Sequence, residues 1–378
     1  MRCVIKQYSQ ISAAEWDKFV YSSSMGWAYF LYDVMAQDRN ANLTHKSFAI
    51  VDADNNDEIL MIMQMHQSSK HPTASQLGLA KERLVSRWGY VLKDGLGKKQ
   101  QHAVKSAFEA YVDGYMFEHN IRSFEADLAP LSVAVMDAKD CVNPLIWFNF
   151  CPNVRYTSVV DLSKPDDRML ADCEETTRQA IRKVTASGRY EVVEAKPNRE
   201  DCQTFIRLHK DTYTRTGAQK SIIADSYHEH MFFHLIPQGV VRVFFLQDKQ
   251  LGETIAAVSI LIYKNTAYYW WCCSKNEKEV GVNKYLLFSV INIIRENFGR
   301  TGWFETGGAH LHKRSGKSKG LTDFKKCFGT TLRPIWCGKY DKLKPVSAVK
   351  HTWGRVMLKH LAQKLHKSAQ KNGKDETK

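Results

Sequence analysis

The segment over residues 281–329 constrains the fold of this chain more than any other. Residues 282–298 are apolar on nearly every face, which predicts a helix that is buried on most sides. A short strand over 303–306 is expected to follow and to end at Gly307 and Gly308. The next loop holds six histidine, lysine or arginine side chains and no acidic residue. A cationic loop beside a helix start is where a phosphate-bearing donor could bind, and a solvated loop next to a buried helix is the alternative.

The net charge of +14 is the unusual feature of the composition. It favours a polyanionic partner, such as nucleic acid, a membrane surface or a phosphorylated substrate. Residues 342–374 contain nine Lys or Arg residues and no Asp or Glu. Over 346–371 apolar residues recur at helical spacing, so we expect a basic amphipathic helix there and a disordered tail after it. The length of 378 residues allows two domains or one large one.

Cysteine usage and hydropathy predict a cytoplasmic protein. The nine cysteines are scattered and none forms a C-x-x-C pair, which is typical of reduced thiols in the cytosol. The first residues have no apolar signal core. No run of about 18 apolar residues occurs, so no transmembrane helix is expected.

The order of the expected elements repeats in the two halves of the chain. In the first half we expect a helix over 27–36, a hairpin of strands over 47–51 and 59–67, a strand over 86–92, a helix over 98–119 and a strand over 146–150. In the second half we expect strands over 156–162, 190–194, 240–246, 255–263, 266–273 and 331–340, with a helix over 200–214 and another ending near 187. The shared order predicts two closely packed mixed α/β domains, 1–152 and 153–341, each with its own central sheet.

Four segments, in this order, resemble the motifs of one family. They are EWDKFVYSSSMGWAYFLYDVM (15–35), SRWGYVLKDG (86–95), ETTRQAIRKVTASG (175–188), and NKYLLFSVINII followed by WFETGGA and LTDFKKCFGTTL (283–332). The second half resembles the GNAT acyltransferase fold. The whole chain resembles the FemAB-like branch, whose members carry two tandem GNAT domains and form peptidoglycan bridges and related amide bonds. The resemblance implies an α/β fold with mixed sheets in two GNAT-like domains, the first of them degenerate, followed by the basic C-terminal helix.

The same resemblance implies the reaction. It is the transfer of an acyl or aminoacyl group from an activated donor to an amine of a cell-envelope, sugar or peptide precursor. Many relatives have an aspartate before the paired glycines, where this chain has Glu305 and Thr306. The glycine-rich pyrophosphate loop R/Q-x-x-G-x-G/A is absent, and KNEKEVGVNKY (275–285) offers only Gly281. This weakens a coenzyme A reading, so acyl-CoA and aminoacyl-tRNA both stay open as donors.

Three residues are candidates for catalysis. Acyl transfer needs a neutral amine, aligned substrates and a positive or N–H partner for the tetrahedral oxyanion. The resemblance places the family's functional Phe-Lys pair on Phe324 and Lys325, so Lys325 is the first oxyanion candidate and Lys326 the second. Glu305, at a strand end, could accept the amine proton. The structural alternatives are exposed lysines on a short amphipathic helix and a salt-bridged glutamate.

Further residues are candidates for binding. In the family the acyl donor runs beside the strand that precedes the buried helix, although a packed aromatic core is the alternative for this strand. The expected donor-binding residues are Trp271, Cys272, Cys273, Gly281, Asn283 and Lys284. The expected substrate-binding residues are Phe324, Gly307, Gly308, His310 and His312, and either histidine could replace Glu305 as the base. His228, His230 and His234 have partial zinc-ligand spacing but lack the H-E-x-x-H pattern, so no metal is expected.

A second class of function stays open beside the enzyme. It is a catalytically degenerate GNAT-fold module that binds nucleic acid or an anionic membrane through its basic surface. The missing glycine loop and the basic tail favour this module, whereas TGGA (306–309) and FKKCFG (324–329) favour the enzyme. The partners expected for the enzyme are an anionic or phosphorylated small molecule or glycolipid, with tRNA as a further candidate. The basic tail could also contact an anionic membrane.

Overall fold

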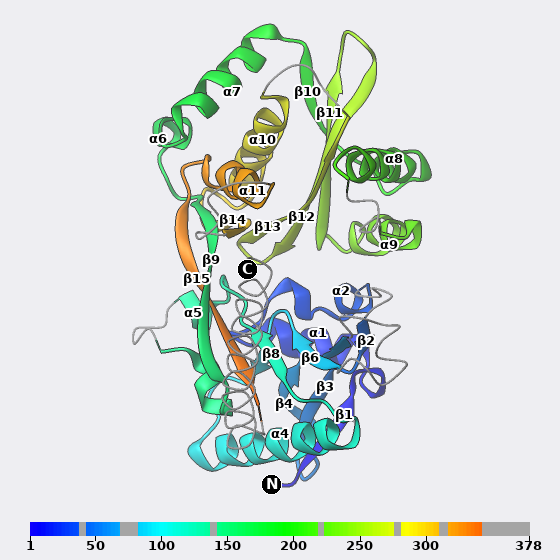
Figure 1. Ribbon diagram of the computed structural model, residues 1–378, viewed down its shortest axis with the longest axis vertical. Helices are drawn as coiled ribbons and strands as arrows, with labels where there is room; N and C mark the ends of the chain where they lie inside the picture. Colours follow the sequence, from blue (N-terminus) through cyan, green and yellow to red (C-terminus); the bar gives the residue numbers. More distant parts are fainter. Residues whose placement is uncertain are drawn as a thin grey trace, which may run out of the picture.

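The structure, a computed structural model, describes residues 1–37, 43–68, 82–136, 142–217, 223–275, 281–309 and 317–341 (Figure 1). The expected basic helix over 346–371, the tail after it, His310 and His312 lie outside the described residues. Within these ranges, no helix has the length and apolar character needed to cross a membrane.

A four-stranded antiparallel sheet lies in the N-terminal half. Its strand order is β1 (Cys3–Gln7), β3 (Phe48–Asp52), β4 (Glu58–Met63) and β7 (Tyr90–Leu92). The expected hairpin is confirmed as β3 and β4, which pair antiparallel. The helix predicted over 98–119 is α4 (Lys98–Glu118). Its Val104, Phe108 and Val112 recur every four residues and are fully buried in one core with this sheet, so one stripe of the helix faces the strands.

An eleven-stranded sheet runs through both halves of the molecule. In spatial order its strands are β10 (Tyr190–Glu194), β11 (Val241–Asp248), β12 (Glu253–Tyr263), β13 (Thr266–Ser274), β14 (Trp303–Ala309), β9 (Cys151–Asp161), β15 (Thr331–Tyr340), β8 (Phe124–Asp127), β6 (Arg83–Ser86), β5 (His66–Ser68) and β2 (Leu43–His45). The pairs β13–β14 and β6–β8 are parallel, and the other neighbours are antiparallel.

This continuous sheet corrects one expectation. The two halves do not each have a separate central sheet, because β15 from the second half lies between β9 and β8 and pairs with both. Figure 1 shows β9 and β15 as long strands that run from one half into the other. The domain boundary after residue 152 stays a prediction, since strand pairing continues across it.

Helices cover both faces of the sheet in the C-terminal half (Figure 1). One face carries α7 (Glu175–Ser187), α10 (Val282–Asn297) and α11 (Lys317–Lys326), and the other carries α8 (Arg199–Arg215), α9 (Asp225–His230) and the π-helical turn η5 (Met231–Leu235). The predicted buried helix is α10, in which Leu286, Val290 and Ile294 have no exposed surface. Helix α10 packs against α7 and β12, so the connection from β13 to β14 is tightly held.

Three expected elements of the first half are wrong in type or extent. The expected helix over 27–36 is a 3₁₀ turn, η2 (Ala28–Phe30), followed by the short helix α2 (Tyr32–Ala36). The expected strand over 86–92 is divided between β6 and β7, which lie in different sheets, because Gly89 turns the chain at a φ of +76°. The expected strand over 146–150 is the 3₁₀ helix η3 (Pro144–Phe148). The Asn143 side chain accepts a hydrogen bond from the backbone N–H of Leu145 at 3.0 Å and starts this helix.

The two halves share one hydrophobic core, as the absence of a flexible linker predicts. Trp16 and Val20 of α1 (Ala13–Ser22) belong to the same core as Phe205 of α8. The Tyr263 hydroxyl on β12 donates a hydrogen bond to the Val20 carbonyl oxygen at 2.8 Å. The remaining short helices are η1 (Tyr8–Gln10), α5 (Val133–Met136) and α6 (Asp166–Ala171).

A close backbone approach at Gly302 sets where β13 and β14 begin to pair. A Cβ atom at Gly302 would lie 1.9 Å from the Asn265 carbonyl oxygen, and its φ is +86°. The backbone N–H of Trp303 donates to the same oxygen at 3.1 Å. Any side chain at this position therefore pushes the loops before β13 and β14 apart.

We expect Gly302→Ala to destabilise the protein more than Gly252→Ala does. Gly252 also has a positive φ, +65°, but beyond its chain neighbours no atom lies within 4 Å of the place that a Cβ would occupy. The control, Gly252→Ala, should lower the free energy of unfolding only by the backbone strain, about 1–3 kcal/mol. Gly302→Ala should lower it by a further overpacking cost of about 1–3 kcal/mol or more. Urea unfolding at equilibrium gives both free energies, and equal losses would contradict the close approach.

Candidate functional site

Strands β13 and β14 separate after a short parallel pairing. They pair only at Thr266 with Trp303, Ala267 with Phe304, and Tyr268 with Glu305. Beyond that point β13 continues to Ser274 along β12, and β14 continues to Ala309 along β9. The carboxyl ends of the two parallel strands therefore diverge, and ligands of open α/β sheets bind at such ends. Glu305 stands at the point of divergence.

Glu305 is a buried carboxylate with one free oxygen. The side chain is 1 % exposed. The Thr157 hydroxyl donates a hydrogen bond to Oε1 at 2.6 Å, while Oε2 has no hydrogen-bond partner among the described residues. Burial raises the pKa of Glu305 to about 7, and the Thr157 hydrogen bond and the nearby Lys325 oppose this rise. A carboxyl with this pKa exchanges a proton readily at neutral pH.

Lys325 reaches the same place through a gap left by a glycine. Its Nζ atom lies 2.8 Å from the position that a Cβ of Gly307 would occupy, and Gly307 has a φ of +102°. The Thr306 hydroxyl, at a bulge of β14, donates to the Lys325 carbonyl oxygen at 2.8 Å and ties α11 to the strand. Burial lowers the pKa of Lys325, and Glu305 opposes this shift. The structure thus brings Glu305, Gly307 and Lys325 together, whereas Lys326 is exposed.

Aromatic side chains from both halves stand next to Glu305. Tyr29 stacks on Trp88 at 4.4 Å between ring centroids and lies edge-on to Tyr268 at 5.6 Å and to Trp270 at 6.1 Å. All four rings are only partly buried. Sequence reasoning did not identify these residues or Thr157 as site residues. The available signal was that Tyr29 and Trp88 lie in two of the family-like segments.

The expected donor residues at the start of α10 lie close to the end of β13. The Asn283 side-chain amide donates to the Ser274 hydroxyl at 3.4 Å, and its Oδ1 is buried without a partner among the described residues. The Lys284 ammonium donates to the Thr177 hydroxyl of α7 at 2.8 Å. A Cβ atom at Gly281 would lie 2.7 Å from the Cβ of Ala180, so only glycine allows α7 this close. These residues surround the N-terminus of α10, where the backbone N–H groups of a helix favour anions.

The expected donor residues on β13 do not share one face. Trp271 lies against His209 of α8 at 5.7 Å between ring centroids, and Cys273 is buried in the same core. Cys272 interacts instead with Tyr269, which belongs to the core on the α10 side. The expected substrate residue Phe324 lies on this second side, 6.4 Å from Tyr269. Gly308 continues β14 opposite Thr157.

Of the histidines with zinc-like spacing, His230 and His234 stack on each other at 4.7 Å between ring centroids, and His228 has other partners. His228 is buried against Phe205 and His209, while Nε2 of His230 lies 2.9 Å from the Asp33 carbonyl oxygen. Across the described ranges, no group of three or more His, Cys, Asp or Glu side chains could hold a metal ion.

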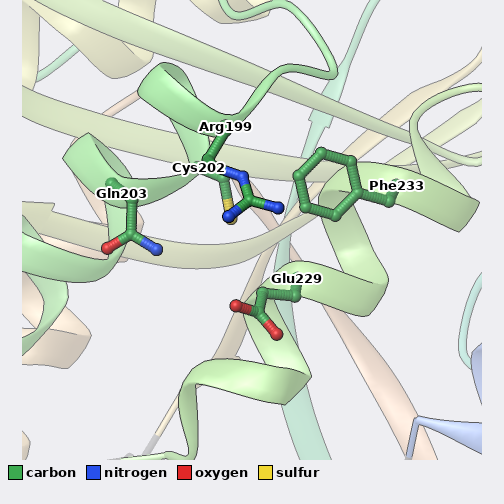
Figure 2. A pocket seen from close by; sticks show the side chains of 5 residues that line it. All are labelled: Arg199, Cys202, Gln203, Glu229 and Phe233. Atoms are coloured by element: carbon green, nitrogen blue, oxygen red, sulfur yellow. The ribbon is translucent and has the colours of Figure 1, made fainter.

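A surface cavity of about 240 Å³ lies between α8, α9 and η5 (Figure 2). Its lining consists of Arg199, Cys202, Gln203, Glu229 and Phe233. Figure 2 shows the Arg199 guanidinium between Cys202 and the Phe233 ring. None of the residues predicted for the site lines this cavity, so it is separate from the Glu305 and Lys325 pair.

Comparison with known proteins agrees with this geometry. Residues 171–313 match the family described as acetyltransferase (GNAT) domain. The matched range contains β13, α10, Glu305 and Gly307. The comparison with curated proteins gave no significant match. The match to a GNAT domain supports acyl transfer as the general activity.

Three solved structures have a similar fold. FemX is 16% identical, with a TM-score of 0.63, over 92% of this chain and 99% of that one. L-PGS from Bacillus licheniformis is 10% identical, with a TM-score of 0.55, and the match covers 88% of this chain and 92% of that one. A tandem GNAT protein from the clavulanic acid biosynthesis pathway is 9% identical, with a TM-score of 0.53, and the match covers 90% of this chain and 98% of that one. Residues 171–313 therefore match a GNAT domain, and the resemblance to FemAB-like tandem GNAT proteins that the motifs predicted is confirmed at the level of the fold.

Proposed function

We propose that this protein is an amide-forming acyltransferase. It moves an acyl or aminoacyl group from acyl-CoA or aminoacyl-tRNA to the amine of a sugar, peptide or glycolipid precursor of the cell envelope. The observation that carries the proposal is the buried Glu305 carboxyl, whose pKa is about 7 and whose Oε2 has no partner in the described part of the chain. It lies beside Lys325 where two parallel strands part. An unpaired buried carboxylate oxygen is costly for folding, so a functional role accounts for it.

Each step of the reaction then has a candidate group. The neutral amine attacks the carbonyl carbon of the donor, and Glu305 Oε2 accepts the proton that the nitrogen loses. The carbonyl oxygen becomes an oxyanion, which the Lys325 ammonium stabilises. The tetrahedral intermediate collapses and the new amide forms. Coenzyme A leaves as a thiolate, whereas tRNA leaves as a ribose hydroxyl after Glu305 returns the proton to its oxygen. Both donors and many envelope precursors are made in the cytoplasm, so we place the reaction there.

The basic surface would contribute affinity for anionic substrates in this proposal. The net charge of +14 is suited to donors that carry phosphates, as both candidate donors do. The residues after 341 hold part of this charge. We propose that they attract an anionic substrate or a lipid headgroup without taking part in the chemistry.

A donor screen tests the proposal. A ligand that binds only the folded protein at a hundred times its Kd stabilises it by about 2.7 kcal/mol. We expect either acyl-CoA or aminoacyl-tRNA to raise the Tm by several degrees, and the donor that does so to support amide formation with an amino sugar or peptide amine. Deacylated tRNA and anionic lipid vesicles are the controls. If these raise the Tm while no donor does, the protein is the degenerate binding module instead.

A further inference from the structure

Two histidines and one tryptophan form a buried polar cluster on the α8 face of β13. His209 of α8 and His228 of α9 are 1 % and 0 % exposed, with ring centroids 4.5 Å apart. Trp271 lies 5.7 Å from His209. Both nitrogens of each imidazole and the indole Nε1 are buried without a hydrogen-bond partner among the described residues. The great majority of buried polar atoms in proteins have a hydrogen-bond partner, so five unpaired nitrogens in one cluster require an explanation.

The cluster offers uncharged hydrogen-bonding groups. Burial lowers the pKa of His209 to about 4 and that of His228 to about 3, so both rings are neutral at pH 7. A neutral imidazole has one N–H donor and one acceptor nitrogen, and an indole has one donor. The nearby charges of Lys210 and Asp225 are paired with each other at 2.7 Å. The three side chains together offer three donors and two acceptors and carry no net charge. Such a cluster suits hydroxyl or amide groups, which both donate and accept, better than it suits a phosphate.

A row of aromatic rings connects the cluster with Glu305. Tyr268 pairs with Glu305 and contacts Tyr29, which contacts Trp270. Tyr227 lies 6.0 Å from Trp270 and 5.7 Å from His228. Trp271 follows Tyr268 by three residues on β13, but a bulge places the two opposite Ser259 and Leu261, which are two residues apart on β12, or roughly 7 Å along the strand. The row is therefore long enough for one sugar ring next to an amine at Glu305.

We propose that His209, His228 and Trp271 bind an uncharged, hydroxyl- or acetamido-bearing part of the acceptor, namely a sugar ring, while the acceptor amine lies at Glu305. The inference rests on the proposed acyl transfer and names the acceptor class. Sugar rings pack their C–H faces on aromatic side chains, and their hydroxyls both donate and accept. The proposal requires the rings of Tyr213, stacked on His209 at 4.4 Å, and of Tyr227 to rotate and admit the sugar, and both rings are only partly buried.

The test follows the two imidazoles directly. The full chain is labelled with ¹⁵N-histidine, and the ring signals of His209 and His228 are identified from the variants His209→Phe and His228→Phe. Two neutral disaccharides, cellobiose and diacetylchitobiose, are added at millimolar concentrations, and inorganic phosphate is added in parallel. We expect at least one disaccharide to shift both signals and phosphate to shift neither. Signals that stay in place with both disaccharides, or that respond to phosphate alone, overturn the proposal.

Matched variants separate binding from folding. The two Phe variants keep an aromatic ring and remove unpaired buried nitrogens, so their Tm is expected to stay equal or rise. Their Kd for the disaccharide is expected to increase at least tenfold, and a Kd within threefold of the unmodified chain overturns the proposal. If a Phe variant fails to fold, His228→Gln, which keeps a donor and an acceptor, is expected to bind within threefold. His234→Phe removes an exposed histidine of the same region and should leave the Kd unchanged.

The binding assay contains no acyl donor, so it is independent of the proposed reaction. If a disaccharide binds and no amine is ever acylated, the proposed function fails and the sugar site stands. If an amine is acylated while neither histidine signal moves, the sugar site fails and the proposed function stands.

Discussion

Glu305→Gln is expected to lower kcat/KM for acyl transfer by about 10²–10⁴-fold, the usual contribution of a positioned general base. Glutamine keeps the shape of the side chain and can still accept the hydrogen bond that Thr157 donates at 2.6 Å, but it cannot accept a proton. Because the loss comes from the chemical step, single-turnover rates with the best donor should fall by the same factor while donor binding stays intact. A variant within threefold of the unmodified enzyme would exclude Glu305 as the base.

The role of Glu305 as a base also predicts how kcat/KM depends on pH. The base acts in its ionised form, so kcat/KM should rise about tenfold per pH unit below about 7, where the pKa of Glu305 lies, and level off above it. Thr157 stabilises the ionised form, since its hydrogen bond lowers the pKa of Glu305. Thr157→Val should therefore move the midpoint to higher pH. A midpoint that stays in place in Thr157→Val would show that another group titrates.

Lys325→Met is expected to lower kcat/KM by about 10²–10³-fold, the cost of removing one oxyanion partner. Methionine retains much of the aliphatic stem that lies against Gly307 and removes the charge. Since Lys325 also lowers the pKa of Glu305, the midpoint of the pH profile should rise in this variant. The neighbouring lysine supplies the control: Lys326 is exposed, and Lys326→Met should stay within about twofold, the range of a surface charge.

Gly307→Ala tests the position of the Lys325 ammonium without replacing the lysine. Its Cβ atom would lie 2.8 Å from Nζ of Lys325, so the ammonium must leave its present position. We expect a rate loss that approaches that of Lys325→Met, with the pH midpoint again raised. Full activity in Lys325→Met, or identical rates in Lys325→Met and Lys326→Met, would contradict the assigned role of Lys325.

The candidate residues that the structure brings together lie close to one another along the chain. Glu305 was a candidate because a strand end was expected at the following glycine pair, although β14 in fact runs through both glycines to Ala309, and Lys325 was a candidate because the resemblance places the family's Phe-Lys pair there. The buried helix was predictable from Leu286, Val290 and Ile294, whose burial on α10 requires no long-range information.

The parts that depend on distant segments could not be predicted from pattern. Thr157, Tyr29 and Trp88 reach Glu305 only through sheet pairing and the packing of the two halves. The strand expected over 146–150 was wrong because local capping by Asn143 outweighs the β-like composition of that segment. The continuous sheet was missed for a related reason: nothing in 331–340 indicates which strands it joins.

The place of β15 in the sheet has a consequence for how the chain matures. The strand fills the gap between β8 and β9, yet about two hundred residues separate it from β8 in sequence. A nascent chain must therefore hold two open strand edges, one in each half, until residues 331–340 leave the ribosome. Unpaired edges attract other strands, and contacts between residues far apart in sequence form slowly. The N-terminal half therefore cannot complete its sheet until residues 331–340 have been synthesised, and chaperone binding to the open edges would matter most before then.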